Sequence, residues 1–270
     1  MMCRVLSVSR SGYYDWLKRL PSQREQENII LADSIKQIFD IEKQRVGAPR
    51  ITRRLRMSGQ NVGKNRVAKV MQQLGIRAKG VKKYKATTNS RHRLPVAPNL
   101  LGQNFEAIRP NQKWVSDITY IWTEEGWLYL AVVLDLYSRL VVGWALSERM
   151  TATLVCDALE MALWRRKRPK NVIIHSDRGV QYCSQQYQDL LSKNNLICSM
   201  SKKGDCFDNA AMESWNRSLK VEAIHGERFA TRAEAKEQVF DYIEVYYNRY
   251  RLHSTIGYLS PEDFEAQKVS

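Results

Sequence analysis

The sequence predicts an α/β protein in two parts, a helical N-terminal region followed by a mixed β-sheet flanked by helices. The first observation is hydrophobic periodicity: apolar residues recur at helical spacing up to about residue 76, and they alternate or run together, as in strands, after Phe105. The second is charge. Residues 1–100 hold 22 lysines and arginines against 6 acidic residues, whereas residues 101–270 hold 21 against 22. A basic module is therefore joined to an almost neutral one.

The composition excludes several classes of protein. Hydrophobic residues make up 44% of the 270, which argues against wholesale disorder. Concentrated positive charge indicates a polyanionic partner, either nucleic acid or an anionic membrane. The most apolar stretch, residues 127–146, carries Asp135 and Arg139 near its middle and is a poor spanning helix. With no signal peptide in the first residues and five cysteines without metal-ligand spacing, we expect a cytoplasmic protein.

The N-terminal elements follow from apolar spacing and breakers. Residues 1–20 resemble a short helix–turn–helix piece with Gly12 at its turn. A second helix is expected from Glu25, a third around residues 51–55 and a fourth over residues 67–74, with Gly75 as its C-terminal cap. We therefore expect a helical DNA-binding region over residues 1–76 and a basic linker over residues 77–104 that follows phosphates.

The last two of these helices suit a helix-turn-helix reader of the DNA major groove. Lys64, Arg66 and Lys69 lie opposite the apolar face of the last helix, and Arg50 lies at the start of the preceding one. Any surface helix also carries basic residues, so the neighbouring charge is what favours DNA contacts at these four positions.

The second half begins with three adjacent strands, WVSDITYIW, WLYLAVVLDLY and LVVGWAL. A helix from Thr151, the strand NVIIHSD, a helix around residues 185–191 and the strand LICSM follow. Two further helices are expected, one capped by Asp208 and one opened by the capping box of Thr231 and Glu234. This order is typical of a ribonuclease-H-like mixed sheet over residues 105–270.

Three acidic residues stand where acids are unfavourable. Asp117 interrupts an aromatic strand, Asp177 ends an apolar strand before a turn, and Glu213 lies on a helix with apolar neighbours. Strand ends and an adjacent helix can bring three such carboxylates together. Carboxylates without His or Cys suit Mg²⁺ or Mn²⁺, and two such ions catalyse transfer at a phosphodiester.

Each acid also has an ordinary explanation. Asp117 could be an edge charge, Asp177 a turn residue and Glu213 a surface charge. The competing acids are simpler to explain, Asp135 as a hairpin turn residue and Asp208 as a helix cap. His175 and His253 are left out of the metal site, because a lone histidine beside a strand is more often structural.

Ordered motifs along the chain resemble the second-reading-frame (OrfB-type) transposases of the bacterial insertion-sequence-three family, relatives of retroviral integrases. They extend from about Val8 to Phe264, and 35 residues separate Asp177 from Glu213, an interval typical of that family. The motifs are VSRSGYYDW, VGAPRI, GKNRVAKVMQQLGI, WVSDITYI, VVLDLYSR, HSDRGVQYCS, SMSKKGDCFDNAAMESWNRSLKVE and YNRYRLHSTIGYLSPEDF.

The resemblance implies a catalytic and metal-binding triad of Asp117, Asp177 and Glu213, with Lys220 as a DNA contact. It implies Mg²⁺- or Mn²⁺-dependent cleavage and strand transfer at insertion-sequence ends, by water and then by a 3′-hydroxyl. It also implies double-stranded DNA as substrate, a homo-oligomer on that DNA, a first-reading-frame (OrfA-type) partner or fusion, and a place at the bacterial nucleoid. Two alternatives stay open: a nuclease or resolvase on the same fold, and a catalytically silent DNA-binding regulator of transposition.

Overall fold

The computed structural model describes residues 2–5, 7–80, 95–202 and 206–269. The chain divides into two compact units, Met1–Ala78 and Lys79–Ser270. Of the expected linker, residues 81–94 lie outside the described part. Within the described part, no helix is both long and apolar enough to cross a membrane.

The first unit is entirely helical, as its periodicity predicts. Its helices are α1 (Met2–Val5), α2 (Arg10–Lys18), α3 (Gln23–Ile41), α4 (Ala48–Met57) and α5 (Lys64–Gln73). A small core joins α3, α4 and α5; its fully covered members include Ile35, Ile51, Leu55 and Val67.

The sequence predicts structural roles for two glycines of this unit. Gly75 follows α5 with a φ of 68°, the left-handed conformation that ends many helices, so its predicted capping role is confirmed. The role predicted for Gly12 is wrong. It lies inside α2, where the Ser9 side chain caps the helix by accepting a hydrogen bond from the Gly12 amide at 3.0 Å. The turn therefore precedes Ser9 rather than falling at the glycine.

The second unit is built on a five-stranded mixed sheet in the order β3-β2-β1-β4-β5. The strands are β1 (Lys113–Thr123), β2 (Gly126–Asp135), β3 (Val141–Ser147), β4 (Ile173–Ser176) and β5 (Ile197–Met200). The first three form an antiparallel meander, and β4 and β5 are parallel to β1. This is the ribonuclease-H-like arrangement expected from the element order.

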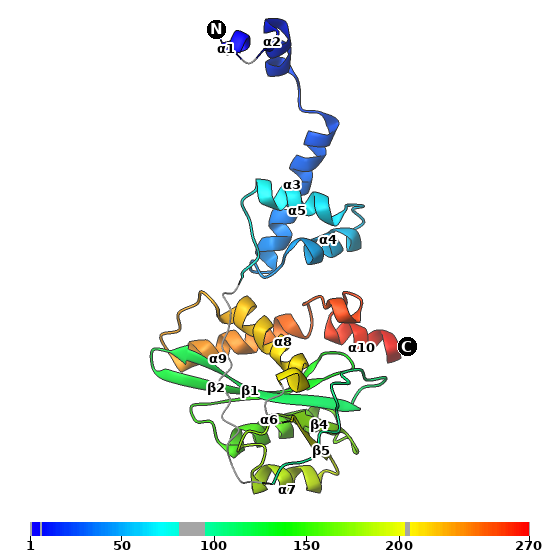
Figure 1. The fold of residues 1–270 in the computed structure, drawn as a ribbon, viewed down its shortest axis with the longest axis vertical. Coiled ribbons are helices and arrows are strands. Elements are labelled where there is room, and N and C mark those ends of the chain that lie inside the picture. The colour runs from blue at the N-terminus through cyan, green and yellow to red at the C-terminus, as the bar shows by residue number, and fades with distance from the viewer. Residues whose placement is uncertain (1, 6, 81–94, 203–205, 270) are drawn as a thin grey trace. The chain divides into compact units, whose positions relative to one another are not determined.

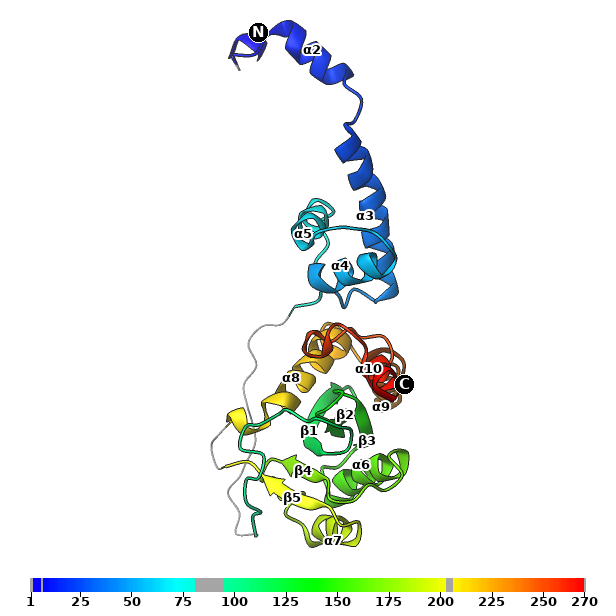
Figure 2. The same ribbon diagram turned by 90° about the vertical axis from the view of Figure 1, so that its right-hand side faces the viewer.

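Helices cover both faces of this sheet (Figures 1 and 2). On one face lie α6 (Ala152–Arg165) and α7 (Gln185–Lys193). On the other lie α8 (Ala210–Leu219), α9 (Arg232–Phe240) and their π-helical extensions η2 (Lys220–Ile224) and η3 (Asp241–Tyr247). The remaining elements are η1 (Cys206–Asn209), η4 (Ser254–Ile256) and α10 (Pro261–Val269).

Close packing between α6 and the sheet depends on a glycine. A Cβ atom at Gly143 of β3 would lie 2.2 Å from the Ala158 carbonyl oxygen and 2.7 Å from the Ala162 amide nitrogen. Because real atoms do not approach so closely, only glycine lets the helix backbone rest on this strand. The helix in turn closes one hydrophobic core.

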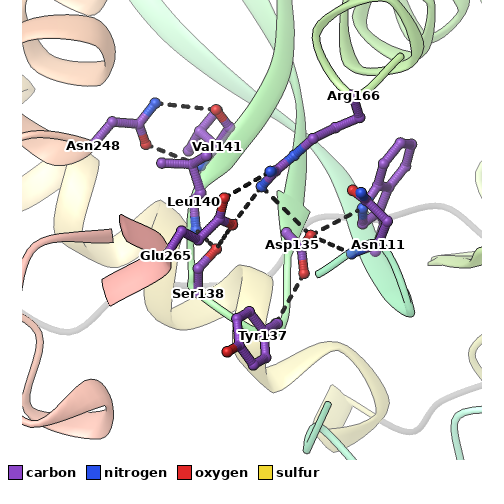
Figure 3. A network of polar contacts seen from close by, with 10 residues as sticks. Asn111, Asp135, Tyr137, Ser138, Leu140, Val141, Arg166, Asn248 and Glu265 are labelled. Atoms are coloured by element: carbon purple, nitrogen blue, oxygen red, sulfur yellow. Dashed lines mark hydrogen bonds and ion pairs between the residues drawn. The ribbon is translucent and has the colours of Figure 1, made fainter. Parts of the chain in front are cut away.

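The C-terminal helix α10 is fastened to the sheet by a polar network (Figure 3). Arg166, the C-cap residue of α6, makes two hydrogen bonds to Glu265, of 2.7 and 2.5 Å, and lies 3.6 Å from Asp135. Asp135 also accepts hydrogen bonds from the amides of Asn111 and Tyr137, so it has the turn role expected of it. The Asn248 side chain bonds both backbone groups of Val141.

The role predicted for Asp208 is wrong. Asn209, not Asp208, occupies the N-cap position of α8, and its side chain makes no capping bond. Asp208 is buried and accepts hydrogen bonds from the side chains of Asn99 (2.9 Å) and Gln103 (3.2 Å) and from the Lys202 amide (2.7 Å). It therefore fastens the segment before β1 to the loop before α8, and Asp208→Asn, which removes one acceptor oxygen, should weaken this connection.

Candidate active site

Two of the three candidate acids lie on neighbouring parallel strands. Asp117 lies in the middle of β1, and Asp177 directly follows β4. The pairing of β1 with β4 ends at Val115 and His175, two residues before Asp117 and Asp177 on each chain segment. In the turn after β4, the Gly179 amide donates to Asp177 Oδ1 at 2.9 Å. The sheet topology thus brings together two carboxylates 60 residues apart in sequence.

The third acid comes from α8, which packs beside β1. Met212, Trp215 and Leu219 bury one side of this helix in the core. Glu213 lies on its exposed side, and Asn216 follows one turn later. The Asn216 side chain donates to Asp117 Oδ2 at 2.8 Å, so the helix is directly bonded to the carboxylate on the strand.

The charges of these acids influence one another. Burial and the neighbouring charges of Asp177 and, more weakly, Glu213 together raise the pKa of Asp117 to about 7. Hydrogen bonds from the Ile118 amide and Asn216 only partly offset these effects. A carboxylate buried beside another carboxylate is electrostatically unfavourable. The site is therefore built to receive positive charge.

The carboxylate oxygens of the three acids are suitable ligands for a hard cation, although the three side chains are not close enough to enclose one. Among the described residues, no group of three His, Cys, Asp or Glu side chains is close enough to hold a metal ion. Asp117 and Asp177 stand together as a pair, while the Glu213 side chain is exposed on α8. Each Asp117 oxygen accepts one protein hydrogen bond, which leaves further lone pairs for an ion. Carboxylate oxygens alone suit Mg²⁺ or Mn²⁺.

The two histidines set aside from the metal site have structural partners. His175 is buried between the hydroxyls of Ser199, 2.8 Å from Nδ1, and Ser201, 3.1 Å from Nε2. Burial lowers its pKa to about 4. His253 contacts Arg251 and the Tyr247 hydroxyl. Neither histidine belongs with the acids.

Lys220, at the end of α8, reaches the same strand as Asp117. Its ammonium nitrogen lies 4.7 Å from the centroid of the Tyr120 ring. Burial lowers the pKa of Lys220, and the charges of Tyr120 and Asp117 oppose this shift. The lysine is therefore positioned beside the acids and is not a fully solvated surface residue.

Asn216 and Tyr120 were not singled out from the sequence. The only signals available were the spacing of Asn216 from Glu213, three residues on a helix, and of Tyr120 from Asp117, three residues on a strand. Neither spacing reveals a contact without the packing of α8 against β1.

The four basic candidates of the first unit have different surroundings. Lys64 and Lys69 are exposed on α5, and Arg50 is half-buried near the start of α4. Arg66 instead points toward α3, where it bonds Asn28 at 2.9 Å and Glu27 at 3.0 Å. Its guanidinium therefore helps to hold α5 on α3.

Comparisons with known proteins cover almost the whole chain. Residues 107–206 and 213–269 match integrase core domains, and residues 24–84 match a helix-turn-helix-like domain. The chain is 54% identical over 276 residues to the transposase InsF for insertion sequence IS3A of Escherichia coli strain K12, across 100% of this chain and 94% of that protein. It is 46% identical to a 31 kDa protein of insertion element IS600 of Shigella sonnei, across 97% of both. Among solved structures, it is similar to the HTLV-2 integrase catalytic core domain in complex with magnesium, at 14% identity and a TM-score of 0.43, across 59% of this chain and 99% of that one.

Proposed function

Because the chain belongs to the IS3 family of insertion-sequence transposases and carries an integrase core, we propose that it cuts and joins DNA at the ends of an insertion sequence through Asp117, Asp177 and Glu213. The observation that carries this assignment is the Asp117–Asp177 pair: burial and the charge of Asp177 raise the pKa of Asp117. Glu213 would complete the triad from α8.

The three carboxylates would hold Mg²⁺ or Mn²⁺, and we propose two ions. When bound, such ions polarise the phosphoryl oxygens and favour deprotonation of the attacking hydroxyl. The protein holds the ligands in place: Asn216 and the Ile118 amide orient the Asp117 carboxylate, and the Gly179 amide orients Asp177. Preorganised ligands of this kind lower the cost of reaching the transition state.

The reaction has two phosphoryl transfers. In the first, water attacks the phosphorus at the element's end, the bond from phosphorus to the 3′ oxygen breaks, and a 3′-hydroxyl is freed. In the second, that hydroxyl attacks a target phosphodiester, forms a new phosphorus–oxygen bond and releases the target's own 3′ oxygen. Neither step needs a nucleotide cofactor, because every bond broken is replaced by an equivalent one.

Double-stranded DNA is the proposed partner of both units. Lys64, Lys69 and Arg50 are the proposed phosphate contacts of the helix-turn-helix-like unit, together with Arg66 if its bonds to α3 exchange for DNA. Lys220 is the proposed contact beside the carboxylates. Basic side chains that neutralise phosphates supply affinity and position the DNA.

Assembly on DNA is a separate part of the proposal. A homo-oligomer would bring two element ends together, and a first-reading-frame partner or fusion would add end recognition. Both would act on bacterial DNA in the cytoplasm.

The test uses the full chain, a labelled element end and Mg²⁺. Asp117→Asn, Asp177→Asn and Glu213→Gln should each abolish cutting and joining but leave DNA binding largely intact. Glu160→Gln, which changes an exposed acid on α6 at the opposite face of the sheet, is the matched control and should retain activity.

The possible products separate the proposed function from its alternatives. Joined products support a transposase, cutting without joining indicates a nuclease or resolvase, and binding without either indicates a silent regulator. A triad variant that joins ends as well as the control would remove that residue from the site.

A further inference from the structure

The β1–β2 hairpin presents an exposed cluster of aromatic rings. Trp122 and Trp127 are cross-strand partners whose ring centroids lie 4.8 Å apart, and Tyr120 lies 5.0 Å from Trp127. Both tryptophans remain open to solvent, with exposed fractions of 57% and 43%. We call Tyr120, Trp122 and Trp127 the hairpin platform.

The platform is exposed because the sheet and its helices end before it. Strand β4 pairs only with residues 113–115 of β1, so in the described structure the rest of β1 has β2 as its neighbour. On the platform's face, packing against α6 and α7 reaches Ile118 of β1 and Tyr129 of β2. The three platform residues belong to neither core of this unit.

Arg232 at the start of α9 braces the base of the platform. Its guanidinium donates to the Trp127 carbonyl at 3.3 Å and lies 3.2 Å from Glu148, while its amide donates to Glu125 at 2.7 Å. The backbone that carries the rings is therefore tied to a helix. A pre-positioned aromatic surface loses little conformational entropy when a ligand binds.

Lys220 links the platform to the proposed active site around the edge of β1. Tyr120 and Trp122 follow Asp117 by three and five residues, so their side chains face α6 and α7, whereas Asp117 faces α8. The Lys220 ammonium lies over the Tyr120 ring and also interacts electrostatically with Asp117. A cation thus lies between the carboxylates and the rings, where an anionic chain leaving the site would pass.

We propose that the hairpin platform stacks unpaired nucleobases of the DNA end. This inference rests on the proposed function. Aromatic rings stack on every base without reading its sequence. The cation at the near end favours a nucleic acid over a second protein, because it supplies a phosphate contact where the rings supply base contacts.

Cross-strand aromatic pairs also stabilise hairpins by themselves, and that role would need no DNA. The two roles differ in one measurable way. A stabilising role affects every substrate equally, whereas a stacking role depends on a base being present at the stacked position.

The experiment compares Trp122→Ala with Trp164→Ala in the full chain. Trp164 is a matched control, since it is 78% exposed on α6 and outside the proposed site. Each protein is assayed on an element end with intact bases and on ends with single abasic nucleotides scanned along the strand. Trp122→Phe, which keeps an aromatic face, is included because it preserves the hairpin if alanine does not.

Trp122→Ala should reduce joining of the intact end by about 5- to 150-fold, and the loss should shrink toward one-fold when the stacked nucleotide is abasic. Trp122→Phe should retain most activity, and Trp164→Ala should match wild type. Equal activity of the two alanine variants would overturn the proposal. So would an equal loss on intact and abasic ends, or a change in oligomeric state that accounts for the loss, which would assign the platform to a protein interface.

A second readout keeps this test separate from the proposed function. The tryptophan fluorescence of a Glu213→Gln chain should be quenched by ends with unpaired bases and less by fully paired ends, and Trp122→Phe should reduce the difference. Quenching without any joining by the active chain would contradict the proposed function but support the platform. Joining without base-dependent quenching would support the proposed function but contradict the stacking role of the platform.

Discussion

At the scale of single residues, Asp117 is the least favourable charge in the proposed site. Its carboxyl group is buried on β1 beside Asp177, and both conditions disfavour its charged form. Asn216 donates to one oxygen while its own carbonyl oxygen is buried without a hydrogen-bond partner among the described residues. Added positive charge beside Asp117 would therefore stabilise its charged form.

The first prediction follows from the burial of Asp117 beside Asp177. Because the pKa of folded Asp117 is raised from 3.8 to about 7, the folded state binds its proton more tightly than the unfolded state, and stability falls as pH rises from about 4 to 7. At pH 8 without metal, Asp117→Asn should therefore melt higher than wild type, by about 2–4 °C for each kcal/mol relieved. The Asn216 amide can flip so that its carbonyl oxygen accepts from the new side chain.

Thermal melts between pH 4 and 8 in a chelator measure this difference, which should vanish near pH 4. Addition of Mg²⁺ should stabilise wild type and not the variant, since only wild type keeps the full ligand charge. A variant less stable than wild type at pH 8 would show that Asp117 is not under repulsion.

Lys220 is the second prediction at this scale. Lys220→Ala should weaken binding of the element's end and slow joining, because a phosphate contact beside the carboxylates is lost, while metal binding stays unchanged. Lys220→Arg should retain most activity, since the contact mainly needs positive charge. Binding titrations at physiological salt, with calorimetry for Mg²⁺, measure both properties. Alanine and wild type with equal affinity would assign the lysine to packing on Tyr120 alone.

At the scale of elements, the helix that carries Glu213 is held by a buried ion pair. The guanidinium of Arg251 makes two hydrogen bonds to Glu222 of η2, of 2.8 and 2.9 Å, and one to Ser218 of α8 at 2.9 Å. The Tyr242 hydroxyl donates to Glu222 at 2.9 Å. Both charged residues are at most 8% exposed. The C-terminal segment thus fixes the end of the helix that carries Glu213.

Arg251→Ala should consequently lower the free energy of unfolding by about 3–5 kcal/mol, because it leaves the Glu222 carboxylate buried without its cation. The matched control is Arg249→Ala, whose exposed pair with Glu262 at 3.4 Å should contribute less than about 1 kcal/mol. Urea titrations followed by circular dichroism compare the two. Similar losses for both variants would contradict the assignment of a buried, structural pair.

At the scale of the whole molecule, charge and chemistry are divided between two units. The first unit has its own hydrophobic core around Ile35 and Ile51, and the second carries the sheet and the acids. DNA affinity is therefore expected mainly from the basic region and catalysis from the neutral one.

A fragment of residues 1–100 should then bind duplex DNA with an affinity that falls steeply with salt, because neutralised phosphates release counterions. Lys64→Ala and Lys69→Ala should each reduce the slope of log affinity against log salt by about one, and Lys36→Ala, on the exposed side of α3, should not. Arg66→Ala should mainly destabilise the fragment, since it removes the bonds to Glu27 and Asn28. A folded fragment without salt-dependent binding would refute the DNA-reading role of this unit.

Local patterns in the sequence determined most of the elements and the fold class. Alternating and continuous apolar runs predicted the five strands, and helical spacing predicted the main helices, because these periodicities arise from backbone geometry alone. The same local reasoning failed where several arrangements share one pattern. A glycine between polar residues fits a turn or a helix interior, and Gly12 lies in α2. The π-helical turns of η2 and η3 do not change which residues are apolar, so the apolar spacing did not predict them.

Only the tertiary structure decided which distant groups meet. The sequence predicted Asp117, Asp177 and Glu213 as candidate metal ligands. The Asp117–Asp177 pair exists because β4 lies beside β1 and parallel to it, and the sequence of a single strand does not determine its neighbours in the sheet. The sequence predicted Asp208 as a helix cap, but in the folded chain its carboxylate accepts hydrogen bonds from the side chains of Asn99 and Gln103. Contacts of this kind depend on how faces pack. Residue type and spacing determine which faces of a helix or strand are apolar or polar. Tertiary packing determines which residues each face contacts.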